Sequence, residues 1–86
     1  MYKLLIANSK TEKKLEKYVQ TMNGIPEKLD RLKQNPRSEL GAHPLHGKLK
    51  GKWGCWLAAN VRLIYVINDM EKIIIIEAAG GHNIYY

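Results

Sequence analysis

The sequence is poor in the residues that build disulfide-stapled or membrane-spanning proteins. Its 86 residues include one cysteine, Cys55, which cannot form a disulfide within the chain, so a reducing compartment is expected. Apolar runs such as Leu4–Ala7 and Ile73–Ile76 fall far short of the roughly 18 residues that span a bilayer, and the N-terminus lacks the apolar core of a signal peptide. A chain this short buries only about 60% of its unfolded surface. We therefore expect one domain over residues 1–86, in the cytoplasm, with no membrane partner and no deep cofactor site.

Acidic residues are scarce in the first part of the chain. Residues 1–52 carry 12 Lys and Arg against 5 Asp and Glu, a net charge of +7, whereas residues 53–86 carry 2 against 3, a net charge of −1. Such a basic segment is typical of a protein that binds a polyphosphate or an acidic partner. The alternative is that these lysines only form the solvated faces of helices.

Apolar periodicity and turn residues predict an α+β fold. A strand is expected over Leu4–Ala7, near the middle of a sheet. A capping-box pattern at Ser9 begins a helix that ends near Gly24, and Pro26 suits the first turn of a second helix that ends before Asn35. Three more strands are predicted at residues 52–58, 61–68 and 73–78.

The order of these elements predicts an N-terminal strand, a helical hairpin and then an antiparallel β-meander, because the last strands are joined by short connections. Their continuous apolar runs indicate that both faces are partly covered, one of them by the hairpin. Residues 36–52 are rich in Gly and Pro and are interpreted as an irregular segment, of the kind that often carries function.

Lysines alternate where this segment enters a strand. If the backbone is extended, Lys48, Lys50 and Lys52 project from one face, with amines about 7 Å apart, because each residue of a strand rises about 3.3 Å. That spacing suits the phosphates of a single-stranded nucleic acid. The alternative is a lysine-rich strand edge that prevents aggregation.

Arg62 is the only arginine after residue 52, and it begins an otherwise apolar strand. It can form a structural ion pair with Asp69 or Glu77. It can also present its two-pronged guanidinium to a phosphate, for which arginine is better suited than lysine.

The end of the chain combines imidazole and phenol groups. His82, Tyr85 and Tyr86 follow a glycine pair, and such side chains can exchange a proton with a ribose hydroxyl or a leaving oxygen. A frayed tail is the alternative. Trp53 and Trp56 can stack on unpaired bases, although a tryptophan in a small domain is more often part of the core.

Two further histidines, His43 and His46, lie in the glycine-rich segment. Together with Cys55 and His82 they have an irregular spacing that does not favour a zinc site, so no metal is expected. Cys55 stands in a predicted strand between two tryptophans and is interpreted as a small apolar core residue.

Three segments together resemble the RelE/ParE superfamily of toxins from toxin–antitoxin systems, with the YafQ and YoeB branch of mRNA interferases as the nearest likeness. The order of strand, two helices and further strands resembles that superfamily over the whole chain. The specific motifs are His43-Pro44-Leu45-His46-Gly47 with its continuation to Trp53, the strand at residues 60–66, and Gly81-His82-x-x-Tyr85-Tyr86.

The resemblance implies a RelE-like β-α-α-β-β-β fold and a ribosome-dependent endoribonuclease that cuts the mRNA codon in the A site. The implied reaction is attack of the ribose 2′-OH on the adjacent phosphate, without a metal or other cofactor. The implied partners are a cognate antitoxin, a 70S-type ribosome and mRNA.

The resemblance also implies roles for individual residues. His82 corresponds to a general acid or base, Tyr86 or Tyr85 to the terminal aromatic residue, and Arg62 to the arginine that supports the scissile phosphate. His43 corresponds to a histidine of the YafQ motif. Residues expected to hold the RNA backbone are Lys48, Lys50, Lys52 and His46.

The sequence departs from both branches of interferases. Trp56 stands where YafQ-like toxins have a histidine and YoeB-like toxins an arginine, and Asn60, Val61 and Lys48 also differ from the expected residues. Two alternative functions follow. One is a ParE-like toxin that poisons DNA gyrase and would not need His82, and the other is a catalytically weakened RNA-binding or partner-binding remnant.

Overall fold

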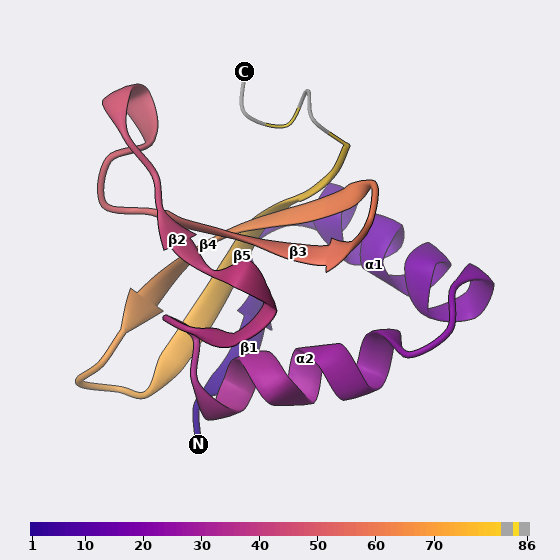
Figure 1. Ribbon diagram of the computed structural model, residues 1–86, viewed down its shortest axis with the longest axis horizontal. Coiled ribbons are helices and arrows are strands. Elements are labelled where there is room, and N and C mark those ends of the chain that lie inside the picture. Colours follow the sequence, from indigo (N-terminus) through magenta and orange to yellow (C-terminus); the bar gives the residue numbers. More distant parts are fainter. Residues whose placement is uncertain (82–83, 85–86) are drawn as a thin grey trace.

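The computed structural model describes residues 1–81 and residue 84, and it shows two α-helices on one side of a five-stranded sheet (Figure 1). The α+β prediction is confirmed. No helix in this part of the chain has the length and apolar character needed to cross a membrane. The elements, in chain order, are β1 (Lys3–Ile6), α1 (Ser9–Thr21), α2 (Ile25–Gln34), the 3₁₀ helix η1 (Glu39–Gly41), β2 (His43–Pro44), a second 3₁₀ helix η2 (Gly47–Leu49), β3 (Trp53–Ala58), β4 (Val61–Asn68) and β5 (Ile73–Gly80).

The strands follow the order β1-β5-β4-β3-β2 across the sheet. β3, β4 and β5 form the predicted antiparallel meander, and β2 adds antiparallel to β3. β1 pairs parallel with β5, with Leu4 opposite Ile74 and Ile6 opposite Ile76. The prediction that β1 lies near the middle of the sheet is therefore wrong. Leu4 and Ile6 of this apolar run share a groove with apolar residues of the two helices. An edge strand that packs against helices can therefore be as apolar as a central one.

Local signals explain how the helices begin. Asn8, rather than Ser9, caps α1, because its side-chain oxygen accepts a hydrogen bond from the Thr11 amide at 2.8 Å. The predicted capping box at Ser9 is wrong, since Ser9 is already the first helical residue. Gly24, with φ at 79°, precedes α2, and Pro26 lies in the first turn as predicted.

The core lies between the helices and one face of the sheet. Leu32 of α2 and Leu57 of β3 are fully buried there. Tyr65 is also fully buried, and its hydroxyl donates a hydrogen bond to the Pro36 carbonyl at 2.6 Å, which holds the start of the irregular segment. Cys55 is completely buried, as predicted, and burial raises the pKa of its thiol to about 12. The thiol is therefore protonated at neutral pH and unsuited to act as a nucleophile.

Hydrogen bonds fasten the turn between β4 and β5 to distant segments. Arg37 donates to both carboxylate oxygens of Asp69, at 3.0 and 2.8 Å, and the Tyr2 hydroxyl donates to the same carboxylate at 2.6 Å. These bonds, that from Arg37 above all, lower the pKa of Asp69 to about 2. The group of three residues thus favours the ionised carboxylate in the folded state.

We expect Asp69→Asn to remove a pH-dependent part of the stability. The lowered carboxyl pKa stabilises the folded state above the unfolded value of about 3.9, and this contribution is lost as the pH falls towards about 2. The urea midpoint of the wild type should therefore approach that of the variant across this interval. Glu71→Gln, in the same turn, keeps Asp69 with its partners, so its urea midpoint should fall with pH as that of the wild type does. An equally large fall of the urea midpoint in Asp69→Asn would contradict the role assigned to Asp69.

Candidate nucleic-acid interface

The candidate interface begins on the face of the sheet turned away from the core. Side chains alternate along a strand, so the buried residues Cys55 and Leu63 place their neighbours Trp56 and Arg62 on this opposite face. Trp56 and Arg62 are register partners in β3 and β4. The Arg62 guanidinium carbon lies 3.9 Å from the centroid of the indole ring, a close cation–π contact.

The two carboxylates that the sequence offered as partners of Arg62 are engaged elsewhere. Asp69 pairs with Arg37, and Glu77 pairs with Lys52 at 2.5 Å between Nζ and Oε1. The guanidinium of Arg62 lies over the ring of Trp56. A phosphate contact remains a prediction for this residue.

The end of β5 lies beside Arg62. The register pairs Arg62 with Gly80, although the two residues are far apart in the chain. The chain then continues through Gly81 to the segment with His82, Tyr85 and Tyr86, which lie outside the described residues. Antiparallel pairing thus brings the phosphate-binding candidate to the point where the segment with the proton-transfer candidates begins.

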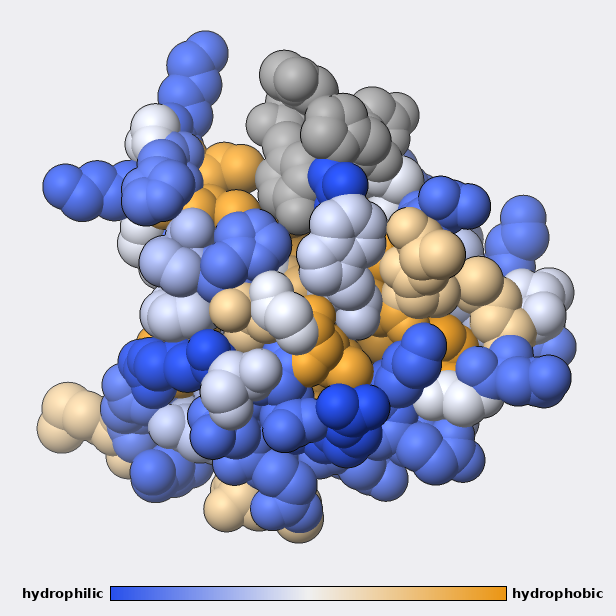
Figure 2. All heavy atoms as spheres, in the orientation of Figure 1, coloured by the Kyte–Doolittle hydropathy of each residue, from blue (hydrophilic) through white to orange (hydrophobic). Residues whose placement is uncertain are grey.

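The predicted row of lysines is not extended. Gly47, the first residue of η2, and Gly51 have φ angles of 64° and 92° and turn the backbone. Lys48 and Lys50 are exposed on this turn, whereas half-buried Lys52 is paired with Glu77. The prediction of three equivalent amines on one strand face is therefore wrong. Hydrophilic side chains project from this part of the molecule at the upper left of Figure 2.

The two histidines of the irregular segment are exposed. His43 lies in β2 opposite Gly54, and its Nδ1 lies 3.0 Å from the Gly41 carbonyl oxygen. His46 immediately precedes η2. Within residues 1–81 and 84, no group of three His, Cys, Asp or Glu side chains could hold a metal ion.

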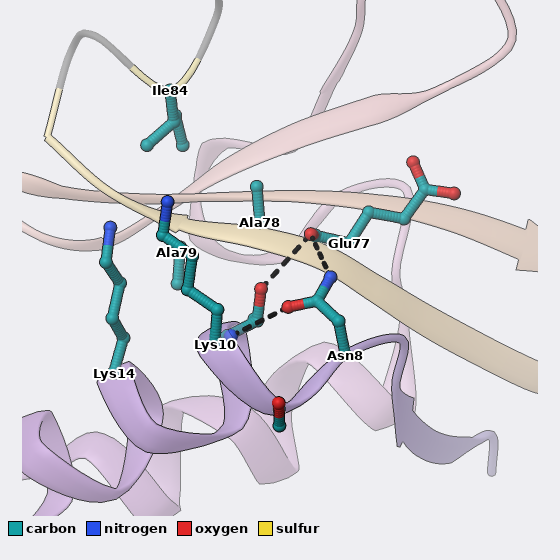
Figure 3. Close-up of a pocket in the computed structure, with 9 residues that line it drawn as sticks. Asn8, Lys10, Lys14, Glu77, Ala78, Ala79 and Ile84 are labelled. Atoms are coloured by element: carbon teal, nitrogen blue, oxygen red, sulfur yellow. Dashed lines mark hydrogen bonds between the residues drawn. The ribbon is translucent and has the colours of Figure 1, made fainter.

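A polar groove of about 450 Å³ lies between the start of α1 and the end of β5 (Figure 3). Lys10 and Lys14 extend from α1 towards Ile84. Asn8 donates a hydrogen bond to the Glu77 carbonyl at 3.2 Å, while the Glu77 carboxylate points away from the groove. The groove therefore presents two amines close to the segment that contains His82.

Sequence reasoning missed this groove. The helical periodicity placed Lys10 and Lys14 on the polar side of α1, which is typical of a solvated face. The excess positive charge of residues 1–52 was the available signal, and it does not say which lysines lie near the chain end. That proximity comes from the contact of α1 with β5, where the Thr11 hydroxyl donates to the Glu77 carbonyl at 3.1 Å.

Comparison with known proteins identifies the class of fold. No family model matches the sequence, and no curated protein sequence matches it. Solved structures do match, among them a YoeB/ParE toxin, a YoeB–YefM complex and YafQ, and this chain shares their fold, as the resemblance implied.

Individual structures match over nearly their full length. A YoeB/ParE toxin from Agrobacterium tumefaciens has a TM-score of 0.74 and 22% identity, over 93% of this chain and 98% of that chain. YafQ from E. coli has a TM-score of 0.69 and 23% identity, over 100% and 99% of the two chains. YoeB–YefM from Staphylococcus aureus has a TM-score of 0.72 and 16% identity, over 95% and 98%. At these identities the likeness establishes the fold.

Proposed function

We propose that this protein is the toxin of a type II toxin–antitoxin system and that it cleaves mRNA in the A site of a 70S-type ribosome. One observation carries the proposal: the β4–β5 register places Arg62 beside the strand end that leads to His82. A guanidinium that binds a phosphate and a nearby group that transfers a proton are the two functions that cleavage at a ribose 2′-OH requires.

The proposed reaction balances without a metal or other cofactor. The 2′ oxygen attacks the adjacent phosphorus while its proton is removed, the P–O2′ bond forms, and the P–O5′ bond breaks as the 5′ oxygen gains a proton. The products are a 2′,3′-cyclic phosphate and a free 5′-OH. His82 serves as general acid or base, and Tyr86, Tyr85 or His43 supplies the second proton transfer.

Arg62 supports this reaction by charge. Negative charge grows on the phosphate oxygens in the transition state, and a guanidinium can donate two parallel hydrogen bonds to them. The cation–π contact with Trp56 limits the orientations that the guanidinium can adopt. A pre-oriented donor is more effective than one that must be ordered during the reaction.

Basic side chains near the site can bind the phosphate backbone of mRNA or of ribosomal RNA. Lys48, Lys50 and His46 are exposed around η2, and Lys10 and Lys14 line the groove beside β5. Lys52 also belongs to this surface, but its ion pair with Glu77 leaves less charge for RNA. Phosphate contacts of this kind provide affinity without sequence preference.

The proposed protein partner is a cognate antitoxin, in the cytoplasm. The S. aureus relative is known in a heterotetrameric YoeB–YefM toxin–antitoxin complex. The net charge of +7 over residues 1–52 favours an antitoxin segment with acidic side chains, because complementary charge increases association rates.

Expression of the wild type and of His82→Ala in a bacterial host tests the proposal. Primer extension on a translated mRNA should show cuts within codons for the wild type. The cuts should fall by about 100-fold or more in His82→Ala, because general acid–base groups contribute about 10² to 10⁴ in rate. Purified ribosomes should be required for the same cuts in vitro.

His46→Ala provides the matched control, since it removes an imidazole from the RNA-binding surface and should retain most of the cleavage. Equal growth arrest by the wild type and His82→Ala, with intact transcripts, would contradict the nuclease. A supercoiling assay on gyrase would then test the ParE-like alternative. Absence of growth arrest, with retained RNA binding, would instead identify a non-cleaving remnant.

A further inference from the structure

Trp56 is unusual for a tryptophan in a domain of this size, because 40% of its surface is exposed. Trp53, three residues earlier in β3, is half-buried and packs against the core with Arg37 above its ring. Odd spacing along a strand puts the two tryptophans on opposite faces of the sheet. Trp56 therefore contributes its ring to the face that carries Arg62, and the core does not require it there.

The indole ring of Trp56 is held in place although it is exposed. Arg62 lies 3.9 Å above its centroid. Gly41 approaches its edge so closely that a Cβ added at Gly41 would lie 3.1 Å from Cδ1 and 3.9 Å from Nε1, and Gly41 has a φ of 68°. The glycine thus satisfies a left-handed backbone conformation and leaves room for the ring. A fixed, exposed aromatic ring loses little side-chain entropy when a ligand stacks on it.

We propose that Trp56, together with Arg62, binds an unpaired RNA base next to the phosphate that Arg62 contacts. The inference rests on the proposed function for the identity of the phosphate, but the stacking site itself can be tested without cleavage. Aromatic rings and guanidinium planes are the surfaces on which proteins stack single-stranded bases. The arrangement joins both on one face of the sheet.

The chemistry of stacking predicts the preference of this site. Every base has a π-face, so stacking tolerates all sequences, and differences arise from stacking strength. Purines present two fused rings to the indole and should bind more tightly than pyrimidines. Trp56 is then a positioning residue, because it places the ribose of the stacked base relative to Arg62 without taking part in proton transfer.

Fluorescence of Trp56 tests the site directly. The chain has two tryptophans, so Trp53→Phe leaves Trp56 as the sole indole. This protein is titrated at low ionic strength with 2′-O-methyl hexanucleotides of adenine or uracil, which lack the attacking 2′-OH. We expect saturable quenching, with several-fold tighter binding of the adenine hexamer.

Substitution of Trp56 in the full chain gives the energetic test. Anisotropy of labelled hexamers should show about ten-fold weaker binding to Trp56→Ala and loss of the adenine preference, since stacking contributes that much or more per base. Trp56→Phe should recover part of both. The matched control, Trp53→Phe, should bind as the wild type does, because Trp53 lies on the core side.

Equal affinity and equal base preference for the wild type and Trp56→Ala would overturn the inference, as would absence of quenching in Trp53→Phe. If Trp56→Ala does not fold, the quenching experiment and Trp56→Phe still decide. Quenching without any mRNA cleavage by the wild type would support the base site and reject the nuclease. Cleavage without quenching would support the nuclease and reject the base site.

Discussion

Arg62→Ala should reduce ribosome-dependent mRNA cleavage by about 100-fold or more, because removal of one preoriented donor to a transition-state oxyanion lowers rates by about 10² to 10³. The substitution also removes the contact that orients Trp56. Arg62→Lys keeps the charge but loses the paired donors, so its cleavage rate should lie between those of the wild type and Arg62→Ala. Single-turnover cleavage on programmed ribosomes measures the effect.

Arg31→Ala is the matched control for Arg62. Arg31 is an exposed arginine of α2, where it pairs with Glu39 at 2.7 Å. Removing it changes the net charge equally, so any loss shared by both variants reports general electrostatic attraction. Wild-type cleavage by a folded Arg62→Ala protein would exclude Arg62 as a phosphate ligand.

Ile76→Ala should destabilise the fold by about 2 to 5 kcal/mol, the range for truncating a buried isoleucine. Ile76 is 1% exposed and lies in β5 between its partners Ile6 of β1 and Tyr65 of β4. Domains of ordinary size have only about 5 to 15 kcal/mol of stability. The loss should therefore appear as a large fall of the urea midpoint.

Ile75→Ala is the matched control for Ile76, because it removes the same atoms from the same strand. Ile75 is only half-buried and lies on the opposite side of the sheet from its neighbour. Its truncation should cost less than half as much. Equal losses for the two variants would mean that the outer face of the sheet is as well packed as the inner one, for example by another protein molecule.

Much of the fold could be predicted from local signals. Pro26 marks the first turn of α2, and short connections make the last strands antiparallel. The errors arose where a local pattern has two readings. The apolar run of β1 suited a central strand but belongs to an edge strand against helices. The alternating lysines at residues 48–52 suited a strand, but Gly47 and Gly51 turn the backbone there and η2 forms in place of a strand.

The candidate site was only partly predictable. Arg62 stood out as an arginine in an apolar strand, and His82 as an imidazole near the chain end, but neither observation says that the two segments meet. For Trp56 the sequence left both base stacking and a place in the core open. Its exposure follows from the alternation that buries Cys55, together with the approach of Gly41 to the indole edge.

The sequence by itself determined three properties of this protein. Cys55 is a small apolar residue of the core, residues 1–52 carry the excess of positive charge, and the helix and strand periods separate apolar from polar side chains. Tertiary structure decided which of these residues meet. The β4–β5 register, with its irregularity between Ile64 and Tyr65, places Arg62 opposite Gly80. Tertiary structure also brings Lys52 to Glu77, and this ion pair neutralises one of the lysines of the basic segment. Such pairings depend on register and chain reversal, which are properties of the whole sheet and cannot be read from any single segment.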